Sequence, residues 1–238
     1  MIRDHTGKPF DLTADHDTRA VSAQSSAWER ITSGVQITPV WVASQIRQLE
    51  RGNVDAFMLL ASRMEERFPQ YGSALRQRKG ALTGLPIRVE PYDETEGSKR
   101  IAEDVTRFMS GYPLRLWLFD LLDSIGKGYS VSSVQWGDGG GRLTPIGYKH
   151  VRPQHVHFDS RDGETPYYRT ATSYMEPREI GGFGHGLEPL SAAPGRWVKH
   201  VHQSRSGLPI NVGLAKSAAY LYLVWTAAIN RWAMFSEV

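Results

Sequence analysis

A lysine between two glycines, Gly126-Lys127-Gly128, is the first stretch whose residue types could bind a phosphate. A P-loop needs a glycine five positions before the Gly-Lys pair and a serine or threonine directly after the lysine. Leu121 and Gly128 occupy those positions here. The flanking residues also predict a helix before the turn and a strand after it, the reverse of the P-loop order. We therefore expect a helix-to-strand turn, capped by glycine, with no phosphate-binding role for Lys127.

The triplet His-Val-His occurs twice, at positions 155–157 and 200–202, and could supply metal ligands. Residues two apart on a strand share a face, so four imidazoles could converge on one ion. A two-histidine phosphoesterase would instead need a serine or threonine where His157 and His202 stand, and Asp159 is the one carboxylate nearby. Since no spacing places the two strands side by side, half-buried sheet histidines are the favoured interpretation. A His-based metal-dependent hydrolase is the alternative.

The glycine-rich stretch GGFGHG at 181–186 is similar in composition to a dinucleotide-binding fingerprint. That motif requires a strand before it, a helix after it and an acidic residue further along the chain. None of these accompanies the stretch, so residues 181–195 are expected to form a loop.

The composition limits the classes of function. With 28 basic and 25 acidic residues the net charge is +3, too balanced for a strong nucleic-acid footprint. The absence of cysteine excludes disulfides and thiolate zinc sites. The N-terminus lacks the apolar core of a signal peptide, and the longest apolar run, 218–229, is too short to span a bilayer. We expect no cofactor, no membrane association and an intracellular protein.

The elements that must position these residues fall into two groups along the chain. Residues 1–37 are polar and predict an extended arm. Thr38 and Pro39 mark the start of a helix that Gly52 closes, and Asn53 is the expected cap of the next helix. Further helices are expected at 70–84, 97–110 and 114–125, with an alternating strand at 85–91.

From residue 128 onward short strands and turns replace the helices. Strands are expected at 128–136, 142–151, 155–159, 167–172 and 196–203, rich in β-branched and aromatic residues. Helices first, then a mainly antiparallel sheet, then one last long helix indicate the α+β class.

The last helix, expected from Asn211 to Val238, carries a sustained apolar seam. Its members recur at alternating spacings of four and three: Leu214, Ala218, Leu221, Trp225, Ala228, Trp232 and Phe235. Such a heptad pattern is typical of a helix that packs along its length against other helices. A central core helix of the domain is one interpretation. Since no later segment of this chain follows to cover the helix, we expect instead that neighbouring subunits cover it, or that the chain lacks its natural continuation, or both.

Five segments in this order resemble one family: QRKGALTGLPIRVEP, GKGYSVSSVQW, RPQHVHFD, KHVHQSRSGLPINVGL and WTAAINRWAMFSEV. They are similar to the portal proteins of Mu-like tailed bacteriophages and their prophages, from about residue 40 to residue 238. The resemblance implies a structural, non-enzymatic protein of the virion, at the capsid vertex, assembled in the bacterial host cytoplasm. It implies self-association into a ring, commonly a dodecamer.

The same resemblance implies partners and a domain plan. Terminase large subunit would pump double-stranded DNA through the ring, with transient, non-specific DNA contact, and head-tail adaptor and capsid proteins would bind around it. Residues 1–37 would be an arm, 38–210 the α+β wing and 211–238 the first stem helix. The family continues into a clip, a second stem helix and a crown, so this chain is expected to be truncated. An inactive prophage remnant is the further alternative.

Overall fold

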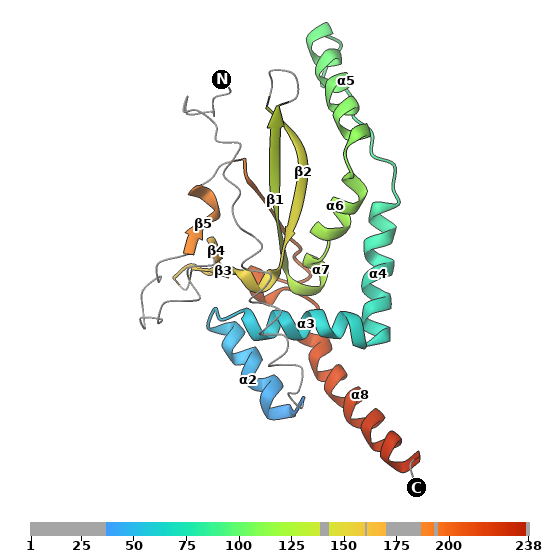
Figure 1. Ribbon diagram of the computed structural model, residues 1–238, viewed down its shortest axis with the longest axis vertical. Coiled ribbons are helices and arrows are strands. Elements are labelled where there is room, and N and C mark those ends of the chain that lie inside the picture. The colour runs from blue at the N-terminus through green and yellow to red at the C-terminus, as the bar shows by residue number, and fades with distance from the viewer. Residues whose placement is uncertain (1–36, 139–142, 160, 170–186, 193–194, 237–238) are drawn as a thin grey trace.

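A computed structural model describes residues 37–138, 143–159, 161–169, 187–192 and 195–236 of the chain (Figure 1). Helices come first, two small antiparallel sheets follow, and a long helix ends the described chain. The α+β prediction is therefore confirmed. The predicted arm, apart from Ile37, and the glycine-rich stretch at 181–186 lie outside the described residues.

Three helices form the base of the body: α2 (Pro39–Glu50), α3 (Asp55–Arg67) and α4 (Pro69–Thr83). The Thr38 hydroxyl caps α2 by accepting from the Trp41 amide, as its position before Pro39 predicts. The predicted cap of α3 is wrong. Val54 occupies that position, and the Asn53 side chain instead donates to Gln48 of α2.

Helix α3 is the centre of the packing. It lies across the base of the hairpin formed by β1 (Tyr129–Asp138) and β2 (Leu143–Val151), with α2 and the last helix, α8 (Ala215–Ser236), on its other side (Figure 1). Its buried apolar residues recur at helical spacing and form much of the core: Phe57, Met58, Leu60, Ala61 and Met64. Because a wide apolar stripe needs cover on several sides, α3 is the element on which the other layers meet.

The sheets have three strands each. One contains β1 (Tyr129–Asp138), β2 (Leu143–Val151) and β6 (Trp197–Val201) in the order β2-β1-β6. The other contains β3 (Val156–Phe158), β4 (Pro166–Arg169) and β5 (Leu187–Pro189) in the order β3-β4-β5. All pairings are antiparallel, as predicted. The predicted loop at 181–195 is wrong in part, because β5 and a 3-10 turn at Leu190–Ala192 lie within it.

Residues 85–91 do not form the predicted strand. An alternating pattern becomes a strand only where a neighbouring strand supplies backbone hydrogen bonds, and no described strand pairs with this segment. Leu85 and Ile87 consequently lie exposed. The segment leads to α5 (Glu96–Gly111), which is capped by Thr95 and has no buried residue.

The predicted helix at 114–125 is divided into α6 (Leu114–Leu121) and a single turn, α7 (Ser124–Lys127). The predicted start of the last helix is also wrong. A 3-10 turn at Pro209–Asn211 precedes α8 (Ala215–Ser236), which begins four residues later than expected. Helix α8 leaves the body beside α3 and projects away from it (Figure 1).

Candidate functional site

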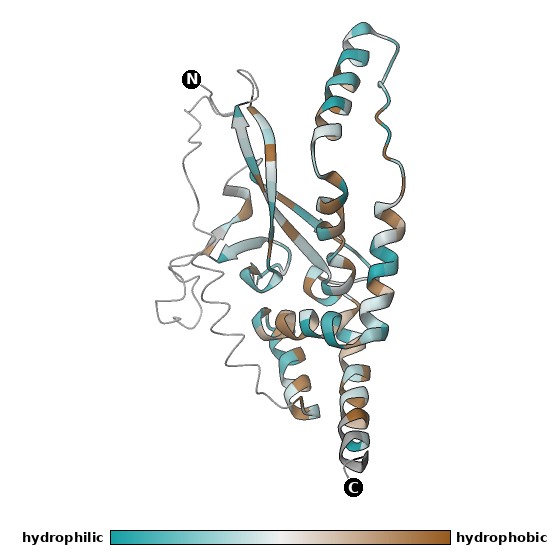
Figure 2. Cartoon of the chain, turned by 45° about the vertical axis from the view of Figure 1, so that its right-hand side comes forward, coloured by the Kyte–Doolittle hydropathy of each residue, from teal (hydrophilic) through white to brown (hydrophobic). Residues whose placement is uncertain are grey.

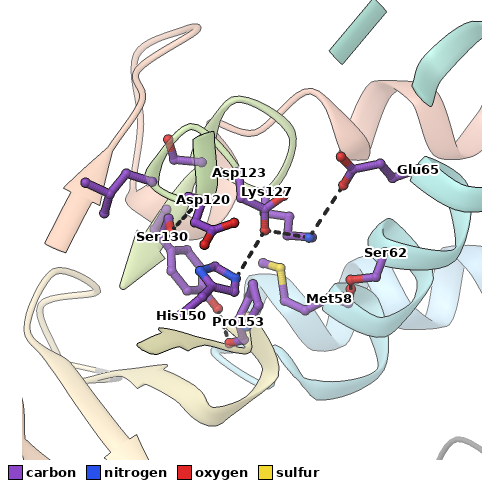
Figure 3. A network of polar contacts seen from close by, with 12 residues as sticks. Met58, Ser62, Glu65, Asp120, Asp123, Lys127, Ser130, His150 and Pro153 are labelled. Atoms are coloured by element: carbon purple, nitrogen blue, oxygen red, sulfur yellow. Dashed lines mark hydrogen bonds and ion pairs between the residues drawn. The ribbon is translucent and has the colours of Figure 1, made fainter. Parts of the chain in front are cut away.

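The lysine of the Gly126-Lys127-Gly128 turn belongs to a largely buried group of four charges, here called the charge cluster. Glu65 comes from α3 and Lys79 from α4, while Asp123 directly precedes α7 and Lys127 is its last residue. Lys127 Nζ lies 2.6 Å from Asp123 Oδ2 and 3.8 Å from Glu65 Oε2. Lys79 Nζ lies 2.8 Å from Glu65 Oε1 and 3.2 Å from Asp123 Oδ1. Each lysine therefore bridges the same two carboxylates. Figure 3 shows the contacts of Lys127 with Asp123 and Glu65.

The charge cluster is electrically balanced. Burial alone would raise the pKa of Asp123, but the nearby ammonium groups of Lys127 and Lys79 outweigh it and hold that pKa below its usual value. Burial would lower the pKa of Lys79, yet Asp123 and Glu65 raise it overall. Asp123 and Lys79 are therefore charged near neutral pH. The Lys127 ammonium is already neutralised by carboxylates, which supports the prediction that it binds no phosphate.

His150 of β2 borders the charge cluster. Its Nε2 lies 3.9 Å from Asp123 Oδ2, and among the described residues nothing hydrogen-bonds to its buried Nδ1. Burial is the main reason that the pKa of His150 is lowered. A cavity of about 490 Å³ opens beside the cluster, and its walls carry both basic and acidic side chains. Such mixed walls favour neither an anion nor a cation.

The two His-Val-His triplets lie in different sheets. His155 precedes β3 and His157 lies on it, whereas His200 lies on β6 and His202 follows it. Within the described part of the chain no group of three or more potential ligands could hold a metal ion. The four imidazoles therefore do not converge in the way the metal-dependent alternative requires.

Each triplet has a structural role. His157 Nε2 lies 3.3 Å from Asp55 Oδ1, and Arg169 Nη1 lies 2.7 Å from Asp55 Oδ2. Burial would raise the pKa of Asp55, but His157 and Arg169 lower it to about 2. The Asp55–Arg169 ion pair joins the start of α3 to the end of β4. In the other sheet, His200 Nδ1 lies 2.8 Å from the fully buried Ser124 Oγ and 3.1 Å from the Leu121 carbonyl oxygen.

The backbone of the turn also contacts the backbone of Gly213 and Leu214, directly before α8, which we call the root of α8. A Cβ on Gly213 would lie 2.5 Å from atoms of Gly126, Lys127 and Gly128 alike. The Leu214 amide donates to the Ile125 carbonyl at 3.2 Å, and the His202 amide donates to that of Gly128 at 3.1 Å. Gly128 has φ +94, a conformation that residues with a side chain rarely adopt. Only glycine permits such a close contact between the two backbones. The turn therefore connects to β1 along the chain and packs directly against the start of α8.

The root half of α8, Ala215 to Trp225, packs on the body. Ala215, Ala219 and Tyr222 are buried, and Leu214, Ala218 and Trp225 are half-buried against the core. The rings of Tyr222 and Trp225 lie 5.8 Å and 5.5 Å from that of Phe68. Three members of the predicted seam, Leu214, Ala218 and Trp225, thus pack within this chain.

The far half of α8, from Thr226 onward, projects beyond the body and carries exposed apolar residues (Figure 2). Trp232 is 71 % exposed, and Ala228 is exposed as well. On the outer side of the root half, Leu221 and Val224 are exposed too, at 65 % and 67 %. Nothing is described of the Phe235 side chain. The predicted seam is therefore divided between the body and an uncovered surface.

Comparison with known proteins shows the family of this chain. The family model for the portal protein of Mu bacteriophage matches residues 58–238. The chain belongs to this portal family. It is 28 % identical over 245 residues to the "Portal protein" of Escherichia phage Mu, and 27 % identical over 252 residues to the "Mu-like prophage FluMu protein gp29" of Haemophilus influenzae strain Rd. Each match covers 100 % of this chain and 44 % of the relative.

Family membership confirms the resemblance drawn from the five sequence segments. Portal proteins are structural and not enzymes, so the hydrolase alternative is not supported. The chain spans less than half the length of these two relatives.

Among the described residues, one helical segment, Pro209–Ile229, is long and apolar enough to cross a membrane by length and composition alone. It extends beyond the uninterrupted apolar run at 218–229, which was expected to be too short to span a bilayer. Core helices of soluble proteins meet the same criterion, and 28 % of the apolar window within the segment is buried.

Proposed function

We propose that this chain is a structural portal subunit that associates with copies of itself through the uncovered surface of α8. The observation that carries the proposal is the exposed apolar row Leu221, Val224 and Trp232 on a helix whose opposite side is held by the body. Covering one large apolar side chain contributes about 1.5–3 kcal/mol, so three such residues give neighbouring copies a strong reason to associate. In this proposal α8 is the first stem helix.

A ring needs two different faces on each copy, because its contacts are heterologous. Helix α5 offers a second exposed apolar face, with Ile101 66 % and Val105 40 % exposed. It lies at the end of the molecule opposite α8 (Figure 1), so the two helices would contact a neighbour at different heights. A short isolated helix is marginal in water, and a neighbouring copy would stabilise α5.

Photo-crosslinking tests the contact at α8. A benzoyl-phenylalanine introduced at Leu221 is expected to give a ladder of crosslinked species beyond the dimer, because each copy in a ring reacts with the next. The matched control places the same group at Arg78, an exposed position of α4, and should give monomer only. Absence of crosslinks at position 221 would contradict the α8 contact.

The finer assignments of the proposal concern the complete virion. They are a dodecameric ring at the capsid vertex, assembled in the host cytoplasm, with terminase large subunit, head-tail adaptor and capsid proteins as partners. DNA would slide through such a ring, and the net charge of +3 supports weak contact. Few neutralised phosphates give a shallow salt dependence of binding. Tight duplex binding at physiological salt would contradict this part of the proposal.

A further inference from the structure

We propose that the Gly126-Lys127-Gly128 turn sets the direction in which α8 leaves the body, with Lys127 as the positioning residue. The proposal deepens the proposed function, because the direction of α8 would decide how neighbouring copies meet. The direction itself can be measured within one subunit, whether or not a ring forms.

The first support is the contact between the turn and the root of α8. Gly213 stands against the turn with no room for a side chain, and the Leu214 amide is bonded to Ile125 within α7. A Cβ on Gly128 would clash with the Pro209 carbonyl oxygen, in the segment that leads into α8. A shift of the turn would therefore move the backbone at the start of α8, because no flexible side chain lies between them.

The second support is how the turn is held. The Asp123–Lys127 pair, four residues apart and 2.6 Å between charged atoms, spans α7 and fixes its shape. The glycine before the lysine presses on α4, where an added Cβ would lie 2.8 Å from Tyr71 Oη and 3.2 Å from Leu75 Cδ1. The turn thus has a single position relative to α4.

The third support is the attachment of α8 to other helices of the body. Lys216 Nζ, at the start of α8, lies 2.6 Å from Glu50 Oε1 of α2, and Tyr222, about two turns after Leu214, packs on Phe68. A helix held at its root and again about two turns later has one direction. The contact between the turn and the root of α8 is made by backbone atoms. The position of the root therefore depends on the shape of the turn.

The buried Asp123–Lys127 ion pair can hold the turn in one position. Replacing such pairs by apolar residues is often neutral or stabilising, which makes stability alone a weak reason for a lysine at this position. The fixed geometry of the Asp123–Lys127 pair is the property that an apolar residue would not reproduce. We therefore assign Lys127 to positioning and not to overall stability.

Two charge-balanced variants separate these roles. K127M/D123N removes the pair that spans α7 and leaves Lys79 bonded to Glu65. K79M/E65Q removes the other pair and leaves Lys127 bonded to Asp123. Each variant loses one positive and one negative charge from the same charge cluster, so neither leaves a buried charge without a partner of opposite sign.

The measurement is the distance between spin labels at Ser73→Cys on α4 and Ala227→Cys on α8, by pulsed electron paramagnetic resonance. Both positions are exposed, and the chain contains no other cysteine. Dilution with unlabelled chain keeps the signal within one subunit. We expect a shifted, broader distance distribution for K127M/D123N and for Gly213→Ala, and the wild-type distribution for K79M/E65Q.

Two results would overturn the proposal. In the first, K127M/D123N and G213A both keep the wild-type distribution, so the turn does not direct α8. In the second, both charge-balanced variants broaden it equally, so the charge cluster stabilises the body without a specific role for Lys127. Failure of the α8 crosslinks described above would leave these distances unaffected, which separates this proposal from that of ring formation.

Discussion

The root half and the far half of α8 have the same apolar character but different surroundings. Tyr222, in the root half, is 2 % exposed, whereas its neighbour Leu221 is 65 % exposed on the outer side of the same turn. The far end of α8 projects away from the other described elements (Figure 1). The comparison shows that two apolar residues of one helix can differ in burial, and that only the packing tells them apart. In the proposed function, the buried residues serve folding within one chain and the exposed residues serve association between chains.

Truncation of Tyr222 should produce the largest effect. Tyr222→Ala removes a buried ring from contact with Phe68 and leaves a cavity, so the free energy of unfolding should fall by about 3 kcal/mol. The matched change Leu221→Ala removes an exposed side chain, and monomer stability should change by less than about 0.5 kcal/mol. Urea unfolding at low protein concentration measures both. Equal losses for the two variants would show that the outer side of α8 is also part of the core.

Acid should weaken the body that holds the root half. The pKa of His155 is lowered to about 4, from the usual value near 6.5, and burial is the main cause. As pH falls below 6.5 the unfolded chain gains a proton that the folded chain does not, so stability is lost down to pH 4. By linkage this loss reaches about 3 kcal/mol. Asp55, with its pKa of about 2, adds a further loss below pH 4.

A comparison of thermal unfolding at pH 7 and pH 5 tests the role of His155. His155→Gln cannot gain the proton, so its stability should fall less over this interval than that of wild type. The control His202→Gln changes a half-buried histidine after β6 and should keep the wild-type pH dependence. If the His155→Gln protein loses as much stability as wild type, another group is responsible.

The ion pair at the root of α8 should contribute least. Glu50 is about half exposed, and partly exposed pairs of this kind contribute about 0–1 kcal/mol. Lys216→Met should therefore lower the free energy of unfolding by less than 1 kcal/mol, well below the effect of Tyr222→Ala. Urea unfolding with and without added salt measures it. A loss as large as that for Tyr222→Ala would mean that charge, and not aromatic packing, holds the root half.

Local signals in the sequence predicted much of the fold. The Thr38-Pro39 pair placed the start of α2, and alternating β-branched residues placed β1 and β2. Predictions were wrong where an element depends on contacts with residues distant in the sequence. Residues 85–91 alternate correctly but have no strand beside them in the described chain, and Asn53 bonds to Gln48 instead of capping α3.

The candidate site was less predictable for the same reason. The Asp123–Lys127 spacing of four residues was the one local sign of the charge cluster. Glu65 and Lys79 come from other helices, and only the fold brings them to Asp123 and Lys127. The heptad seam of α8 was visible in the sequence, but periodicity cannot state which members face the body. Trp225 packs on Phe68, whereas Leu221 and Trp232 are exposed.

The oligomeric state of the purified chain tests the central claim most directly. Multi-angle light scattering should find wild type as a multimer, and L221E/V224E/W232E as a folded monomer, because three charges on the uncovered surface oppose association. The control S73E/A74E/Q77E adds three acidic side chains to the exposed side of α4 and should remain a multimer. A wild-type chain that is monomeric at the highest concentrations reached would contradict the claim that α8 joins neighbouring copies.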